Sequence, residues 1–273
     1  MLSDFHLHSK FSGDSQAEPE EIIQNAMAKK MKHICFTDHL DIDYPEDDCD
    51  FNLDVDTYFP FISKLNEKYT GKIDILTGME AGLQPHISDE LDSCIKKYDF
   101  DFIIGSSHIV NGMDPYYKRY FEGRNNHDAY MEYFLSIKDC LKTCRNFDVY
   151  GHIDYVIRYT PYTDQPFRYT DFSDVIDDIL KELIYNGKGI EINTGGYAQG
   201  LSQPNPCPDI IKRYRELGGE IITVGSDAHI AKDIGRYFEN AKNVLIDCGF
   251  KYYTIFRKRK PEFISLNTIS GNL

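Results

Sequence analysis

Seven short runs rich in isoleucine, valine, leucine and phenylalanine recur along the chain, separated by segments in which apolar residues have helical spacing. The runs lie near residues 2–8, 33–37, 73–79, 102–107, 148–151, 188–193 and 221–226. This alternation predicts strands and helices in turn. Connections of this length join parallel strands, because antiparallel neighbours need only a short hairpin. The sequence therefore predicts an α/β fold built on one parallel sheet or barrel.

Several of the helices between these runs can be placed. An apolar stripe behind Pro19 predicts a helix near residues 19–27, because proline suits the first turn of a helix. Ser88 is expected to cap a second helix through its hydroxyl. Further stripes predict helices at 174–185 and 208–217, each stopped by glycine. These helices would cover the sheet.

Length and composition set the class of protein. The 273 residues suit one large α/β domain, and we expect a single domain over residues 1–273. The seven scattered cysteines form no C-x-x-C pair and predict reduced thiols in a cytoplasmic protein. No apolar run approaches the roughly 20 residues of a membrane helix, so we expect no membrane partner. The net charge of −14 disfavours nucleic acid as a partner, unless bound cations reverse the local sign. The oligomeric state is left open.

Histidine, aspartate and glutamate recur where the apolar runs end. Six of the nine histidines lie at predicted carboxyl ends of strands, which random placement would not produce. Such ends meet at one face of a parallel barrel, so these side chains should converge. Imidazole mixed with carboxylate suits Zn²⁺, Mn²⁺ or Fe²⁺ better than Mg²⁺ or Ca²⁺. The predicted metal ligands are His6, His8, Asp14, His39, Glu80, His108, His152, Asp227 and His229.

The number of donors bears on the number of ions. His6 and His8 alternate along a strand and can grip one ion from one face; alone, such a pair is more often a coincidence or a satisfied core histidine. Nine donors exceed the needs of one ion and predict two or three divalent ions with bridging carboxylates. The alternative is a structural polar layer. Asp38 and Asp154, beside ligands, are expected to orient imidazoles.

Other segments follow strand ends, where loops of parallel α/β proteins carry function. Residues 40–56 are strongly acidic and predict a loop over the strand ends or, alternatively, simply solvated surface. Residues 111–125 are rich in glycine and aromatic side chains, and residues 195–207 are rich in glycine and proline. The basic run at 257–260 predicts a solvated or salt-bridged patch.

The motifs around the predicted ligands carry a family resemblance. They read D-F-H-L-H-S at 4–9, T-D-H at 37–39, G-M-E at 78–80, G-S-S-H at 105–108, G-H-I-D at 151–154 and G-S-D-A-H at 225–229. As a set they resemble the motif series of the polymerase and histidinol phosphatase (PHP) superfamily, and within it the monofunctional histidinol-phosphatase branch. The likeness runs over essentially the whole chain, including E-I-N-T at 191–194.

The resemblance implies a distorted (β/α)7 TIM-like barrel with a site for three ions. The implied ligands are His6, His8, Glu80 and Asp227 for the first ion, Glu80, His108 and His152 for the second, and Asp14, His39 and His229 for the third. Some family members have a histidine at the position of Asp14, so this chain departs from them in one implied ligand of the third ion.

The implied activity is hydrolysis of L-histidinol phosphate to L-histidinol and phosphate, in histidine biosynthesis, by a hydroxide that bridges two ions. The residues expected to act in catalysis are Asp227, His229 and Arg158. One alternative is a PHP phosphoesterase acting on another small phosphate monoester or on nucleic acid ends. Another is a non-catalytic module of the same family, although such modules tend to lose ligands.

A phosphate monoester also needs contacts outside the ion cluster. Arg158, six residues past His152, is the candidate for a bidentate grip on phosphate oxygens, with an ordinary surface arginine as the alternative. Ser107 is a candidate substrate contact, or else a hydrogen-bonding loop residue. Tyr117 could stack on a substrate ring or simply pack.

Overall fold

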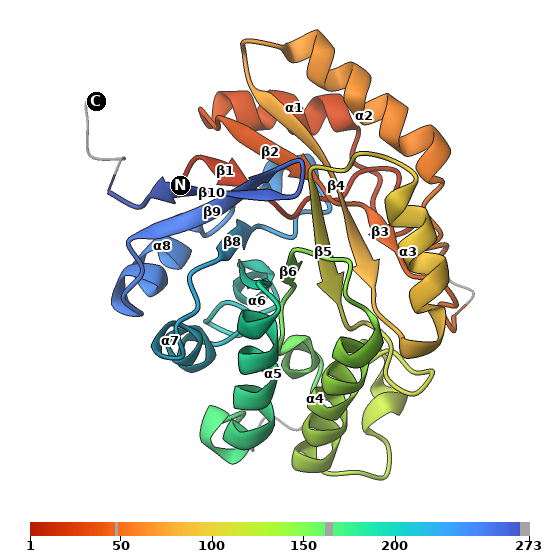
Figure 1. The fold of residues 1–273 in the computed structure, drawn as a ribbon, viewed down its shortest axis with the longest axis vertical. Coiled ribbons are helices and arrows are strands. Elements are labelled where there is room, and N and C mark those ends of the chain that lie inside the picture. The colour runs from red at the N-terminus through yellow and green to blue at the C-terminus, as the bar shows by residue number, and fades with distance from the viewer. Residues whose placement is uncertain (47–48, 162–165, 268–273) are drawn as a thin grey trace.

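The centre of the fold is a parallel sheet whose strands follow the order of the chain (Figure 1). The computed structural model describes residues 1–46, 49–161 and 166–267, so residues 47–48 of the predicted acidic loop lie outside it. A two-residue strand, β3 (His39–Leu40), pairs with β4 beside the main path. The strands of that path are β1 (Ser3–Asp4), β2 (His33–Phe36), β4 (Asp74–Gly82), β5 (Phe102–Ser106), β6 (Val149–Tyr150), β7 (Gly189–Asn193) and β8 (Ile222–Gly225).

Backbone hydrogen bonds bring the two ends of this sheet together. The amide of Phe5 donates to the carbonyl of Val224 at 2.9 Å, and the amide of Asp227 donates to the carbonyl of His6 at 3.0 Å. The segment after β1 therefore lies beside the segment after β8, and the sheet curves into a nearly closed barrel (Figure 1). Each of the seven strands falls on a predicted apolar run, and the predicted (β/α)7 barrel is confirmed.

Helices cover the outside of the barrel (Figure 1). They are α1 (Pro19–Ala28), α2 (Val55–Tyr69), α3 (Ser88–Lys96), α4 (Asn126–Thr143), α5 (Ser173–Tyr185), α6 (Gly195–Ala198), α7 (Pro208–Glu216) and α8 (Phe238–Asp247), with 3-10 turns η1 (Pro85–Ile87), η2 (Lys118–Phe121), η3 (Tyr155–Arg158), η4 (Tyr169–Asp171) and η5 (Ala231–Asp233). In the part of the chain that the structure describes, no helix combines the length and apolar character needed to cross a bilayer.

The four helices placed from the sequence correspond to α1, α3, α5 and α7. The predicted cap of α3 is wrong. Ser88 already has helical backbone angles, because η1 leads directly into α3, and Ile87 occupies the capping position without a side-chain hydrogen bond.

An antiparallel hairpin, β9 (Tyr252–Arg257) and β10 (Lys260–Ser265), packs against the barrel. The ring of Phe256 lies 5.0 Å from that of Phe102, and the guanidinium of Arg257 lies 2.5 Å from Asp74. Asp74 begins β4, so the hairpin lies near the amino ends of the strands. Arg257 and Arg259 of the basic run at 257–260 are thus salt-bridged, while Lys258 and Lys260 are exposed, so the run combines its two predicted states.

Candidate metal centre

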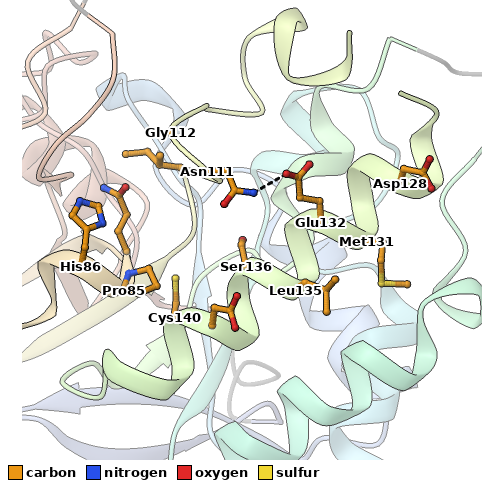
Figure 2. A pocket seen from close by; sticks show the side chains of 13 residues that line it. Pro85, His86, Asn111, Gly112, Asp128, Met131, Glu132, Leu135, Ser136 and Cys140 are labelled. Carbon is orange, nitrogen blue, oxygen red and sulfur yellow. Dashed lines mark hydrogen bonds between the residues drawn. The ribbon is translucent and has the colours of Figure 1, made fainter. Parts of the chain in front are cut away.

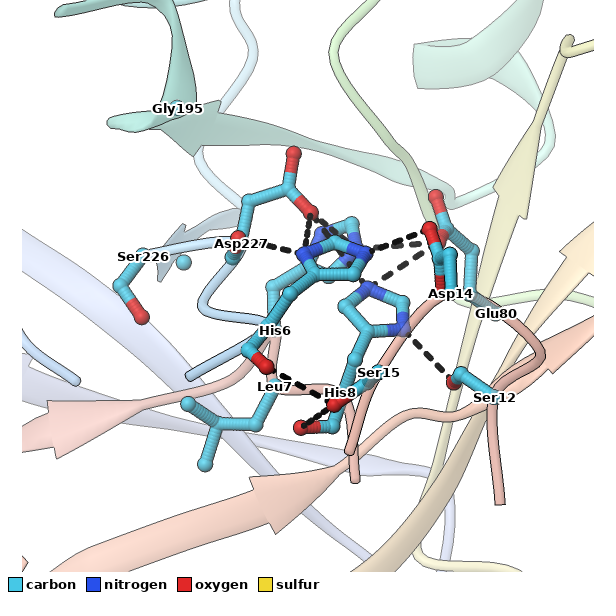
Figure 3. Close-up of polar contacts among 12 residues, drawn as sticks. His6, Leu7, His8, Ser12, Asp14, Ser15, Glu80, Gly195, Ser226 and Asp227 are labelled. Atoms are coloured by element: carbon cyan, nitrogen blue, oxygen red, sulfur yellow. Dashed lines mark hydrogen bonds and ion pairs between the residues drawn. The ribbon is translucent and has the colours of Figure 1, made fainter. Parts of the chain in front are cut away.

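The nine predicted ligands converge at the carboxyl-terminal face of the barrel, and Figure 3 labels His6, His8, Asp14, Glu80 and Asp227 among them. Each lies in or just beyond the carboxyl half of a strand. Because the strands are parallel, their carboxyl ends lie at the same face of the barrel. His6, His8 and Asp14 follow β1, His39 follows β2 and begins the short β3, Glu80 lies in β4, His108 follows β5, His152 follows β6, and Asp227 and His229 follow β8.

Four donor atoms form the first group, around one carboxylate oxygen of Glu80. The Nε2 atom of His6 lies 3.1 Å from Glu80 Oε2 and 3.6 Å from Asp227 Oδ1. The Nε2 atom of His8 lies 3.5 Å and 3.4 Å from the same two oxygens. These are the residues that the resemblance assigns to the first ion.

The other oxygen of Glu80 belongs to a second group. Glu80 Oε1 lies 3.0 Å from the Nε2 atom of His152 and 3.3 Å from the Nε2 atom of His108. It also accepts a hydrogen bond of 2.6 Å from the hydroxyl of Ser106. One carboxylate therefore faces two groups of imidazoles, which is the geometry of a bridging ligand.

The third group lies beside the first. The Oδ2 atom of Asp14 is 3.0 Å from His229 Nε2 and 3.8 Å from His39 Nε2. The ring of His8 packs against both imidazoles, with centroid distances of 4.1 Å to His229 and 4.2 Å to His39, and those two rings lie 5.9 Å from each other. The structure thus brings together all three predicted sets of residues.

Unsatisfied atoms in the cluster test whether cations fit. Five of its buried side-chain atoms have no hydrogen-bond partner among the described residues: His6 Nε2, His8 Nε2, His39 Nδ1, His152 Nδ1 and Glu80 Oε2. A buried polar atom without a partner costs about 1–3 kcal/mol. His6 Nδ1 donates to Glu191 at 2.7 Å, so Nε2 is the nitrogen that His6 turns toward Glu80 Oε2, 3.1 Å away. Divalent cations between these donors would satisfy them, and the donor set fits such ions.

The electrostatics of the metal-free cluster keep its carboxylates ionised and His8 neutral, the states in which these groups bind metal. Burial raises the pKa of the Glu80 and Asp227 carboxyls, but nearby histidines, His6 foremost, outweigh it and hold both pKa values well below their usual range. Burial, helped by the positive charges of His229 and His39, lowers the pKa of His8 to about 3. The carboxylates are therefore charged and His8 is neutral at neutral pH.

The side chains that orient the imidazoles differ from those predicted. Asp41 Oδ1 lies 2.8 Å from the Nδ1 atom of His108 and is 2% exposed, so this member of the acidic segment is not solvated surface. Glu191 holds His6 in the same way. Two sequence signals could have found them: Asp41 follows His39 at strand spacing, and Glu191 is a carboxylate inside an apolar run.

Asp38 and Asp154 do not contact imidazoles in the predicted way. Asp38 accepts from the Ser12 hydroxyl at 2.8 Å, and that hydroxyl lies 3.0 Å from His8 Nδ1 (Figure 3). Asp38 is therefore linked to His8 only through Ser12. Asp154 instead accepts from Asn205 at 2.6 Å and from a backbone amide. The prediction for Asp154 was wrong, because its carboxylate faces the loop that contains Asn205 and Cys207 instead of an imidazole.

Arg158 lies at the edge of the cluster. Its Nη1 atom donates to Asp227 Oδ2 at 2.9 Å, Nη2 donates to Asn193 at 2.9 Å, and Nε donates to Asn205 at 2.8 Å. The side chain is 4% exposed. Arg158 is therefore not an ordinary surface arginine, and it holds the carboxylate of a predicted ligand.

A cavity of about 350 Å³ opens over the cluster. Arg158 and Tyr117 lie in its wall. Ser107 does not join them, because its hydroxyl lies 2.6 Å from that of Tyr150 and its carbonyl accepts from Tyr133. The wall also includes Asp14, His39, Asp41, Tyr44, Phe51, Glu80, His108, Asp114, Tyr116, His152, Tyr155, Tyr159, Gln199, Asp227 and His229.

A larger hollow, of about 530 Å³, lies beside α4 (Figure 2). None of the nine predicted ligands lines it. Its carboxylate Glu132 already accepts a hydrogen bond of 2.7 Å from Asn111. The candidate site is therefore the smaller cavity, where the donor cluster forms the floor.

A parallel barrel with imidazoles and carboxylates gathered at the carboxyl ends of its strands has the architecture of a metal-dependent hydrolase. The family model described as the PHP domain matches residues 4–195. This chain belongs to the PHP domain family.

Relatives match over nearly the whole length. A protein of Clostridium acetobutylicum named "Probable histidinol-phosphatase" is 37% identical over 96% of this chain and 100% of its own length. The histidinol-phosphatase of Lactococcus lactis is 32% identical over 94% of this chain and 95% of its own. A crystal structure of histidinol phosphate phosphatase from the same organism, complexed with zinc, L-histidinol and phosphate, aligns with a TM-score of 0.89 and 31% identity over 96% of this chain and 98% of that one.

Proposed function

We propose that this protein is a metal-dependent phosphatase that hydrolyses L-histidinol phosphate to L-histidinol and phosphate, a step of histidine biosynthesis. The observation that carries the proposal is the convergence of nine imidazole and carboxylate donors at one face of the barrel, where seven of them line one cavity. Full-length similarity to histidinol-phosphatases, one of them solved with zinc, L-histidinol and phosphate, supports the substrate.

The donor groups support divalent ions, and the number and identity of these ions are part of the proposal. We propose two or three ions, with Mn²⁺, Zn²⁺ and Fe²⁺ as the candidates. When bound, such ions lower the pKa of water and neutralise charge on phosphate oxygens. Their ligands would be His6, His8, Glu80 and Asp227 for the first ion, Glu80, His108 and His152 for the second, and Asp14, His39 and His229 for the third.

Arg158 would supply the positive charge outside the ion cluster. A guanidinium has five N–H donors, and the three contacts to Asp227, Asn193 and Asn205 leave one hydrogen on each Nη atom. Those hydrogens can donate to oxygens of a phosphate in the cavity while the arginine stays fixed in place. Because the same side chain holds Asp227, it also positions a ligand.

Aromatic side chains would bind the rest of the substrate. Tyr117 lies in the cavity wall beside Tyr116, whose ring centroid is 5.1 Å away. The two rings are nearly perpendicular, and an aromatic wall of this kind suits an imidazole ring through stacked or edge contacts. Ser107 has no place in this proposal, because its hydroxyl faces Tyr150. The cytoplasmic location stays a prediction from the composition.

Phosphate release tests the proposal. The purified protein, supplied with Mn²⁺ or Zn²⁺, should hydrolyse L-histidinol phosphate with kcat/KM at least about 100-fold above that for p-nitrophenyl phosphate or phosphoserine. Glu80→Gln should abolish turnover of every substrate, which controls for a contaminating phosphatase. Equal rates on all three monoesters would contradict the specific substrate, and release of nucleotides from labelled oligonucleotide ends would point to the other PHP activity.

A further inference from the structure

Glu191 is a fully buried carboxylate at the centre of β7 that is not one of the nine predicted ligands. Its Oε1 atom accepts from His6 Nδ1 at 2.7 Å. Its Oε2 atom accepts from the backbone amide of His152 and from Asn193 Nδ2, both at 3.1 Å. One side chain thus contacts a residue of the first donor group and a residue of the second.

The barrel leaves a fitted space for this carboxylate. A Cβ atom at Gly225 would lie 2.3 Å from Glu191 Oε1 and 2.3 Å from the Cβ of His6, and a Cβ at Gly151 would lie 3.5 Å from Oε2. Gly151 follows β6 and Gly225 ends β8, the two strands that flank β7. Side chains larger than hydrogen at Gly225 would push Glu191 and His6 apart, so the glycine permits the contact.

The hydrogen bond to Glu191 decides which nitrogen of His6 faces the other donors. Because Nδ1 donates to Glu191, that nitrogen carries a proton, and Nε2 is the nitrogen left to hold an ion beside Glu80 and Asp227. A carboxylate behind a ligating imidazole also raises its basicity and locks its ring. Through the amide of His152, the same carboxylate fixes the backbone of a second ligand.

We propose that Glu191 is a positioning residue of the ion cluster, setting the tautomer of His6 and tying the first donor group to the second. The inference rests on the metal centre of the proposed function but not on its substrate. The competing explanation is that Glu191 only satisfies buried polar groups and contributes to folding. Asp148 allows the two to be separated, because it is 8% exposed and accepts from the amide of Ile103 at 2.8 Å near the opposite end of the barrel.

Metal binding gives a readout independent of turnover. Full-length wild type, Glu191→Gln and Asp148→Asn are stripped of metal and titrated with Zn²⁺ against a chromophoric chelator. We expect the Kd of the tightest ion to rise about 10- to 100-fold in Glu191→Gln and to change little in Asp148→Asn. The visible spectrum of bound Co²⁺ should change in Glu191→Gln alone, because only there does a ligand ring change its orientation.

Each outcome either supports or overturns the positioning role of Glu191. Wild-type affinity in Glu191→Gln, or an equal loss in Asp148→Asn, would overturn the positioning role. If Glu191→Gln does not fold, Glu191→Asp serves instead: it keeps the charge but is one methylene too short to hold both contacts, so it should bind Zn²⁺ more weakly than wild type, and unchanged affinity would again overturn the inference. A wild-type protein that binds no ion would instead defeat the proposed function.

Discussion

One residue of the cluster has an uncommon backbone conformation. Asp227 has φ = 56°, in the left-handed region that few side chains other than those of asparagine and aspartate adopt readily. Its amide donates to the carbonyl of His6 at 3.0 Å, and its Oδ2 atom accepts from Arg158 at 2.9 Å. Contacts on both sides therefore hold a conformation that is unfavourable by itself, as is common at functional sites.

The Arg158–Asp227 pair makes Gly195 sensitive to substitution. A Cβ atom there would lie 2.8 Å from Asn193 Oδ1 and 3.0 Å from both Arg158 Nη2 and Asp227 Oδ2. In Gly195→Ala we expect the pair to shift and kcat/KM for L-histidinol phosphate to fall about 10- to 100-fold, since small misplacements at a reacting centre have large effects. Steady-state phosphate release measures the loss.

Gly200→Ala is the matched control for that variant. Gly200 has φ = 86° and no atom within 4 Å of an added Cβ, so alanine there strains the backbone without touching the site. It should lower the free energy of unfolding by about 1–2 kcal/mol and leave kcat/KM near wild type. Similar kinetic losses in both variants would show that loop strain, rather than the displaced ion pair, reduces activity.

Residue types at strand ends were enough to find the nine residues that converge, because the end of a strand is a local feature of the sequence. The carboxylates that contact the imidazoles of these residues were harder to find. Glu191 reaches His6 across 185 positions of the chain, and Asp41 reaches His108 across 67. Such pairs depend on which strands become neighbours in the barrel, and no local sequence pattern predicts that adjacency. Asp38 and Asp154 were chosen for sequence proximity to ligands, which does not determine contact.

At the scale of elements, apolar runs predicted the strands, but the β9–β10 hairpin was missed. Its turn residues Lys258 and Arg259 have φ = 49° and 62°, values for which hairpins usually employ Asn-Gly or Asp-Gly. Tertiary contacts hold this turn instead. The amide of Lys258 donates to Asp101 Oδ1 at 3.0 Å, and the amide of Arg259 donates to the Asp101 carbonyl at 2.9 Å.

The hairpin should stabilise the fold through Arg259. Its Nε atom lies 2.5 Å from Asp148 Oδ2, and Asp148 is 8% exposed. Arg259→Met would leave this carboxylate without its cation, and we expect the free energy of unfolding to fall by about 2–3 kcal/mol. Urea denaturation measures this change. Exposed Lys260→Ala should change it by less than about 0.5 kcal/mol; equal effects would contradict a specific role of the ion pair.

His33, at the same amino-terminal end of the barrel, begins β2 and contacts residues of the two neighbouring strands, β1 and β4. His33 Nδ1 lies 2.9 Å from Ser3 Oγ, and its Nε2 atom lies 3.7 Å from Asp74. Burial, with the charge of Arg257, lowers the pKa of His33. The unfolded chain then binds more protons than the folded one below about pH 6.5, so this group's contribution to stability is complete above that pH and is lost as the pH falls.

We therefore expect His33→Gln to flatten the pH dependence of folding stability. Free energies of unfolding of the metal-free protein at pH 5 and pH 7 should differ less in the variant than in wild type. His127→Gln, at an exposed position on α4, serves as the comparison. Unchanged slopes in His33→Gln would mean that His33 titrates alike in the folded and unfolded chains.

At the scale of the whole molecule, the barrel concentrates negative charge. The chain has a net charge of −14, and folding brings Glu80, Asp227, Asp14, Asp41 and Glu191 to one face. Like charges at this spacing repel, and burial strengthens the repulsion. In the metal-free chain the neighbouring histidines offset this repulsion, since they hold the pKa of the Glu80 and Asp227 carboxyls below the usual range. A cation site that exists only in the folded chain couples metal binding to the stability of the entire barrel.

Removing metal should therefore lower the melting temperature of the whole chain in one step, since we propose that residues 1–273 form a single domain. An ion present at 100 times its Kd stabilises the folded state by about 2.7 kcal/mol, or roughly 5–10 °C for a domain of this size. Calorimetry with chelator and after Zn²⁺ is restored measures the shift, which Glu80→Gln should reduce. An unchanged melting temperature would contradict the coupling, and two separate transitions would contradict the single domain.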